Sequence, residues 1–185
     1  MKRNIKVINK DLFWTLDTLA TILRYEDWEI VGSLTFPSCI RKPSEVHDID
    51  IVVYSDETGL LDEIVESDSL YDDQYPEDFD VKHGKLKLDV RQDDTGVCIP
   101  VTVIQKPAAE CTGESGAADF YYCGVKGRIH KVRDVVLGSI EGAMEAKASY
   151  LEKSGGKAAY RKKHSQDLQN YFKWKTGQFK QADGW

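Results

Sequence analysis

Two aspartates separated by a single residue, Asp48 and Asp50, are the clearest candidates for chemistry in this sequence. They lie in the segment HDIDIVVY, which is short and rich in β-branched residues and predicts a strand over residues 47–54. Successive side chains of a strand alternate between its faces, so both carboxylates point to the same side. Two like charges held together repel unless a cation neutralises them, and Mg²⁺ prefers carboxylate and phosphate oxygens. The pair predicts a divalent metal site, although strand ends also carry solvated carboxylates.

A Gly-Ser pair, Gly32-Ser33, precedes these aspartates, and a further carboxylate, Asp89, follows them on a later predicted strand. The succession is VGS, then fourteen residues, then DIDIVV beginning at Asp48, then KLDV. It resembles the nucleotidyltransferase fold superfamily, which includes polymerase β, antibiotic nucleotidyltransferases and the minimal nucleotidyltransferases of toxin–antitoxin systems. The resemblance covers about residues 28–91 by motif.

This resemblance implies transfer of a nucleoside monophosphate group from a nucleoside triphosphate (NTP) to a hydroxyl, with release of pyrophosphate. It implies that backbone amides around Gly32 and Ser33, with the Ser33 hydroxyl, hold the phosphates. Asp48, Asp50 and Asp89 would bind Mg²⁺, as a pair of ions. Asp89 would also help to deprotonate the acceptor hydroxyl. The acceptor would be a small molecule, a protein or a tRNA.

A weaker likeness extends to the C-terminal region. There EAKASYLEKSGGKAAYRKKHSQDL is similar to the K…R-x-K-D-x-x-D-L run that follows the catalytic domain in several small members of the superfamily. Lys147, on the predicted C-terminal helix, could reach the triphosphate, whereas a lysine on a helix surface is the common alternative. His164 lies on an apolar seam, where a packed, hydrogen-bonded histidine is expected rather than a ligand. Arg41, in the turn between the motifs, could contact phosphate or be solvated.

The residues themselves leave alternatives open. Gly32-Ser33 could be a turn with a helix cap. Asp89 alternates with Lys and Arg residues along its strand and could belong to a surface ion-pair ladder. The run IPVTVI could instead supply the third strand, because I-P-V-D-h is a common pattern in the superfamily, and Thr102 would then stand where the acid should be. That alignment predicts a weakened or inactive enzyme. The alternative function is accordingly a catalytically inactive binding or regulatory protein of this fold, for example in a toxin–antitoxin or defence system. A metal-dependent nuclease is a third interpretation.

The elements that position these residues are predicted by hydrophobic periodicity and turn residues. The patterns indicate helices over 11–26, 59–71, 131–153 and 157–174, strands over 28–31, 85–92 and 96–105, and an acidic loop over 71–80. The expected fold is α/β with a mixed sheet. It comprises a nucleotidyltransferase-like core over residues 1–125 and C-terminal helices over 126–185.

Composition limits the function classes. The net charge of −6 combines 12 Lys+Arg against 25 Asp+Glu in residues 1–125 with 13 against 6 in residues 126–185. The acidic part could concentrate divalent cations and the basic part could attract phosphates. No apolar stretch is long enough for a membrane span, and the four cysteines form no C-x-x-C pair. We therefore expect a cytoplasmic protein with reduced thiols and no membrane partner. A homodimer is a further expectation.

Overall fold

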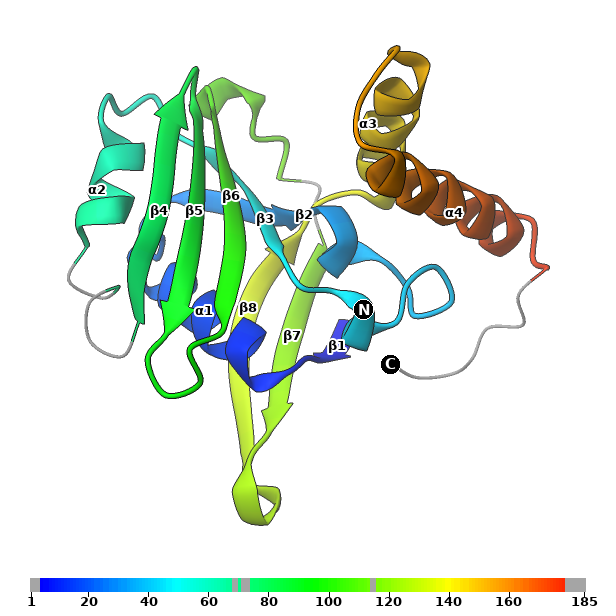
Figure 1. The fold of residues 1–185 in the computed structure, drawn as a ribbon. Helices are drawn as coiled ribbons and strands as arrows, with labels where there is room; N and C mark the ends of the chain where they lie inside the picture. Colours follow the sequence, from blue (N-terminus) through cyan, green and yellow to red (C-terminus); the bar gives the residue numbers. More distant parts are fainter. Residues whose placement is uncertain (1–3, 68–69, 71–73, 114–115, 179–185) are drawn as a thin grey trace.

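A mixed sheet with the strand order β1-β7-β8-β2-β3-β6-β5-β4 forms the centre of the molecule (Figure 1). The computed structural model describes residues 4–67, 70, 74–113 and 116–178. The strands are β1 (Asn4–Val7), β2 (Asp27–Val31), β3 (Ile49–Tyr54), β4 (Gln74–Lys82), β5 (Lys85–Gln92), β6 (Cys98–Lys106), β7 (Gly116–Cys123) and β8 (Ile129–Leu137). The α-helices are α1 (Lys10–Ile22), α2 (Leu60–Glu66), α3 (Ile140–Glu152) and α4 (Ala158–Lys175). The predicted α/β fold with a mixed sheet is confirmed, since β3 pairs antiparallel with β2 and parallel with β6.

Helix α1 covers the core face of this sheet. It begins at the N-cap Asn9, whose side chain accepts a hydrogen bond of 2.9 Å from the Leu12 amide. Its residues Leu12, Leu16 and Leu19 recur at helical spacing and are buried. They share one hydrophobic core with alternate residues of the strands, among them Ile49, Ile51, Leu88, Val101 and Phe120. Because alternate residues of β3 and β6 are buried there, the intervening polar residues point to the opposite face of the sheet.

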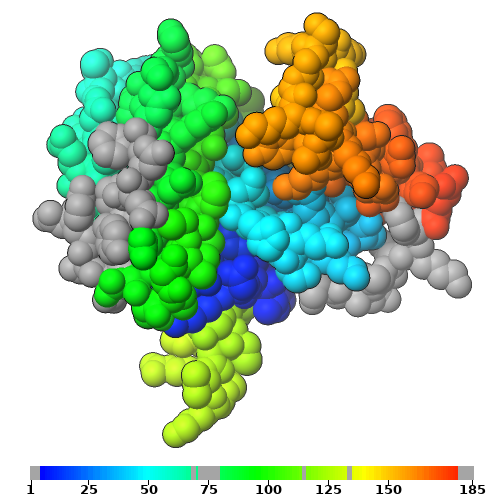
Figure 2. Space-filling model, in the orientation of Figure 1, coloured from blue at the N-terminus to red at the C-terminus, as the bar shows by residue number. Residues whose placement is uncertain are grey.

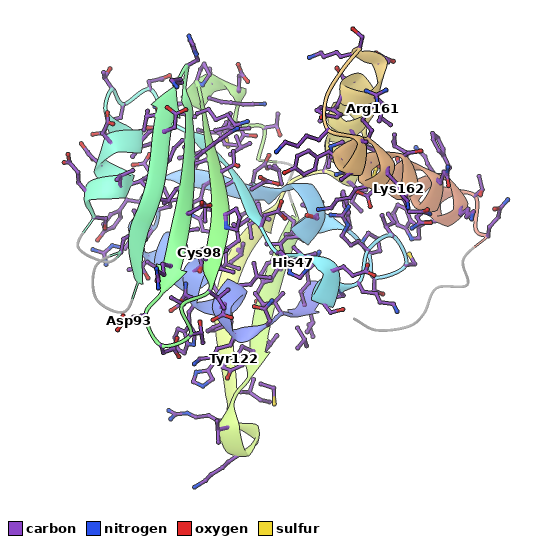
Figure 3. The ribbon with its side chains drawn as sticks, in the orientation of Figure 1. His47, Asp93, Cys98, Tyr122, Arg161 and Lys162 are labelled. Carbon is purple, nitrogen blue, oxygen red and sulfur yellow. The ribbon has the colours of Figure 1, made fainter. Side chains whose placement is uncertain are left out.

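Helices α3 and α4 pack against each other next to that opposite face (Figure 1). They pack on the segment after β2 through a small second core of Phe36, Ile40, Met144 and Tyr171. Arg161, at the start of α4, closes the turn between the two helices (Figure 3). Its guanidinium donates hydrogen bonds of 2.9–3.1 Å to the backbone carbonyls of Leu151, Lys153 and Gly155. The pair therefore has a fixed internal geometry and is anchored to the sheet at the segment that follows β2.

Three predicted elements differ from the structure. The helix predicted over 59–71 ends at Glu66. The helix predicted over 131–153 is wrong in its first part, where residues up to Leu137 belong to strand β8, and helix α3 begins only at Ile140. The loop predicted over 71–80 is wrong from Gln74 onward, where β4 begins; residues 71–73 lie outside the described residues. β8 is an integral strand of the sheet, whereas the division of the chain at residue 125 stays a prediction. Within the described ranges, no helix is both long and apolar enough to cross a membrane.

Candidate active site in the cleft between the sheet and the helix pair

The Gly-Ser turn and the two aspartates meet at the start of strand β3. Val31 at the end of β2 pairs with Asp50, so the next residues, the 3₁₀ turn Gly32–Thr35, lie directly against the carboxylates. Gly32 has a φ of +72°, and a Cβ at this position would lie 2.5 Å from Oδ2 of Asp50. Ser33 Oγ donates a hydrogen bond of 3.3 Å to Oδ1 of Asp48. Only glycine combines this backbone conformation with so close an approach, so the turn and the carboxylates form one unit.

The Asp50 carboxylate lies where its negative charge is disfavoured. Burial raises the pKa of Asp50 to about 6, and the negative charge of Asp48 adds to this rise. A hydrogen bond to Thr102 and the charge of Lys147 act in the opposite direction but do not cancel it. At neutral pH the site therefore holds an ionised carboxylate that its surroundings disfavour, which is an arrangement that a bound cation would stabilise.

Lys147 faces this pair from helix α3 and belongs to a buried network of charges. Its Nζ lies 3.1 Å from Oδ2 of Asp167 and 3.2 Å from Nδ1 of His164. The guanidinium of Arg41 also donates to Oδ2 of Asp167, and the side chains of Arg41 and Asp167 are only 5% and 4% exposed. Both cations lie over the ring of Phe36, Lys147 at 5.4 Å and Arg41 at 5.9 Å. The lysine is thus held in place rather than mobile on a helix surface.

A cleft with a volume of about 630 Å³ separates the sheet from the helix pair. Figure 2 shows it as a hollow between strands β5 and β6 on one side and helices α3 and α4 on the other. It is lined by Gly32, Asp50, Lys85, Thr102, Lys106, Lys147, Tyr150 and His164, among others. Two lysines of the strands and one of the helices thus line the same cleft as the half-buried Asp50, together with one further acid, Glu29. The size and charge suit an anionic small molecule together with a metal.

Asp89 lies outside this cleft. In the sheet, Asp50 pairs with Thr102 and Thr102 with Lys87, whereas Asp89 pairs with Pro100. Asp89 is therefore two strands from the pair, roughly 10 Å across the sheet. It lines a neighbouring cavity of about 400 Å³, which shares Thr102 with the main cleft. In the described part of the chain, no group of three or more His, Cys, Asp or Glu side chains could hold a metal ion. The catalytic and metal-binding roles of Asp89 stay predictions.

The structure also places the remaining candidates and adds Asp167 to them. Arg41 is buried in the ion-pair network rather than solvated. Asp167 was not singled out from the sequence; its only signal is its place as the last acid of the D-x-x-D-L pattern. His164 is packed and hydrogen-bonded, with Tyr150 in edge contact at 5.0 Å, as its position on an apolar seam predicts. Burial lowers the pKa of His164, and the nearby Lys147 contributes in the same direction.

No protein-family model matches the sequence, and no curated protein matches it. Solved structures with a similar arrangement include JHP933 from Helicobacter pylori, at 13% identity and a TM-score of 0.49 over 89% of this chain and 64% of that one. Another is an antigenic nucleotidyltransferase-like protein from Paracoccidioides brasiliensis, at 15% identity and a TM-score of 0.49 over 88% of this chain and 76% of that one. The chain thus spans 64% of the length of JHP933. Likenesses of this size concern the fold alone, so what the cleft can do is inferred from its own residues.

Proposed function

We propose that this protein is a nucleotidyltransferase that moves a nucleoside monophosphate group from an NTP to a hydroxyl acceptor and releases pyrophosphate. The observation that carries the proposal is the unit formed by Asp48, Asp50 and the Gly32–Ser33 turn, with Lys147 across the cleft. The unit offers carboxylates for a metal, a hydroxyl for phosphate, and a buried cation for the opposite side of a triphosphate. These are the groups that phosphoryl-type transfer requires, because its catalysis consists mainly of positioning and charge stabilisation.

The residues present fit Mg²⁺ in the role of a metal shared with the substrate. Asp48 and Asp50 would hold it, and the described residues offer no third acidic or imidazole ligand at this position. Mg²⁺ is usually bound through one or two carboxylates together with substrate phosphates and water, so a two-carboxylate site is sufficient once NTP is present. When bound, the metal would neutralise charge on the phosphates and on Asp50. We therefore expect metal and NTP to bind together rather than separately.

The chain's own groups would position the triphosphate as follows. The Ser33 hydroxyl and nearby amides would contact its oxygens from the sheet side, and Lys147 would contact them from helix α3. In the reaction, an acceptor oxygen forms a bond to the α-phosphorus while the bond from that phosphorus to the bridging oxygen breaks. Pyrophosphate leaves with the electron pair, and the proton of the acceptor hydroxyl passes to solvent water. Asp48 and Asp50 would stabilise the developing charge through the metal that they hold, and Lys147 would stabilise it directly.

The proposal is tested by incubating the protein with each NTP, radiolabelled at the α-phosphate, in a cell extract with Mg²⁺. We expect label to appear on one class of acceptor and to be lost in the folded variants Asp48→Asn and Asp50→Asn. Asp94→Asn, which removes an exposed carboxylate outside the cleft, should transfer label normally. Transfer that persists in both site variants would refute the proposed site.

One observation favours a second candidate, an NTP-binding protein without transferase activity. Thr102, and not an acid, is the direct neighbour of Asp50 on β6. If the transfer step needs a third carboxylate there, the natural protein binds NTP but turns it over slowly or not at all. The variant Thr102→Asp distinguishes the two candidates. A large gain of label transfer over the natural protein would favour the binding role, whereas measurable transfer by the natural protein that the substitution leaves unchanged or reduces would show that Thr102 suits a working site.

A further inference from the structure

Lys6, on the short edge strand β1, is a buried cation far from the cleft in sequence. Its side chain is on the buried face of that strand, and the residue is only 2% exposed. Its Nζ donates hydrogen bonds to the backbone carbonyls of Leu34 and, at 3.4 Å, of Phe36. Burial lowers the pKa of Lys6 to about 7. Lysine is rarely buried to this extent, because removing an ammonium from water is unfavourable unless polar partners replace the water.

The segment that receives these hydrogen bonds carries groups from both sides of the cleft. It begins with Gly32 and Ser33, which lie against the aspartate pair. It ends at Phe36, whose ring lies beneath the Lys147 ammonium at 5.4 Å. The 3₁₀ turn itself is short; within it, the Phe36 amide donates to the Ser33 carbonyl at 3.2 Å and the Thr35 hydroxyl donates to the Gly32 carbonyl at 2.6 Å. A turn of this length depends on contacts from outside for its geometry.

We propose that Lys6 is a positioning residue for the triphosphate site: by holding the carbonyls of Leu34 and Phe36, it fixes the turn that places Ser33 against the phosphates and Phe36 beneath Lys147. This inference rests on the proposed function, because it assigns Lys6 to the same NTP site. Lys6 does not itself touch the substrate. Its effect is expected on the local geometry of the turn and on affinity for the phosphates, because an apolar side chain of similar length would fill the same volume but leave the two carbonyls without this donor.

The test replaces the amine and keeps the shape. In Lys6→Met the side chain loses its donor, so the two carbonyls are no longer tied and the turn gains freedom. With inorganic triphosphate and Mg²⁺ as the probe, calorimetric titration should show binding about tenfold weaker than in the natural protein, as for the loss of a hydrogen bond from a charged group. Lys6→Gln keeps a shorter donor and should fall between the two. Val7→Thr, on the same strand but with its side chain half exposed, should bind normally.

Two further readouts separate a positioning role from a structural one. Lys6→Met should remain folded, while exchange of the Phe36 amide hydrogen should become faster and triphosphate binding weaker. Unchanged triphosphate affinity in a folded Lys6→Met, or a lower melting temperature with unchanged exchange at Phe36, would overturn the inference. If Lys6→Met does not fold, Lys6→Gln is judged by the same readouts. If the natural protein binds no triphosphate, the proposed function fails, and the Phe36 exchange still decides whether Lys6 fixes the turn.

Discussion

Replacing Asp50 by asparagine should stabilise the metal-free protein at neutral and alkaline pH. Burial, aided by Asp48, raises the pKa of Asp50 from 3.8 to about 6 in the folded state. Between these values the folded protein holds more protons on this group than the unfolded chain, so stability falls as pH rises through the window. Each pKa unit corresponds to about 1.4 kcal/mol, so ionised Asp50 costs about 2–3 kcal/mol above pH 6. The asparagine side chain of the variant would occupy the same volume without the charge.

The assay is urea denaturation of the natural protein and Asp50→Asn in EDTA at a series of pH values from about 4 to about 8. The variant should be more stable by about 2–3 kcal/mol at the alkaline end of the series, and the difference should shrink toward zero at the acidic end. Glu63→Gln, which removes an exposed carboxylate on α2, should differ by less than about 0.5 kcal/mol throughout. Adding Mg²⁺ with NTP should reverse the order, because only the natural protein gains stability from the ligands. A difference that does not vary with pH would refute the reasoning.

Two further substitutions test the geometry of the site. Gly32→Ala places a Cβ against Oδ2 of Asp50 in a left-handed conformation; a loss of about 1–3 kcal/mol in the free energy of unfolding is expected, together with loss of triphosphate binding. Asp167→Ala leaves the two buried cations beside it without their shared anion, so unfolding measurements should show a loss of about 3–5 kcal/mol. Asp94→Ala, which breaks only an exposed ion pair, should cost less than about 1 kcal/mol, and a similar loss in both would contradict the assigned network.

The strands nearest the site were predictable because their patterns are local. DIDIVV alternates cleanly between core and cleft, and the hairpin of β5 and β6 buries every second residue as its sequence indicates. Strand β8 was not predictable in this way. Val132 and Val135 both face the core three residues apart, because the pairing with β7 shifts register between Ala118 and Phe120. Because of this shift, these two buried residues are spaced as in a helix and not two apart as in a regular strand, so the sequence pattern resembled a helix.

The site shows the same division between local and long-range information. The Gly-Ser turn, the aspartate pair and Lys147 were found from sequence motifs, and the structure brings Gly32, Asp50 and Lys147 into one cleft. The position of Asp89 could not be judged from its own strand, because it depends on β6 lying between β5 and β3. The pairing of Arg41 with Asp167 joins residues 126 positions apart, and no local pattern predicts such a contact.

The claim that Asp48, Asp50 and the Gly32–Ser33 turn form a metal–triphosphate site is common to the catalytic and the binding interpretations. Calorimetric titration of each NTP into the folded protein, with Mg²⁺ and then with EDTA, tests it most directly. We predict binding of at least one NTP that requires Mg²⁺ and is abolished in the double variant Asp48→Asn/Asp50→Asn. Binding of equal strength in the natural protein and the double variant, or in Mg²⁺ and EDTA, would contradict the account.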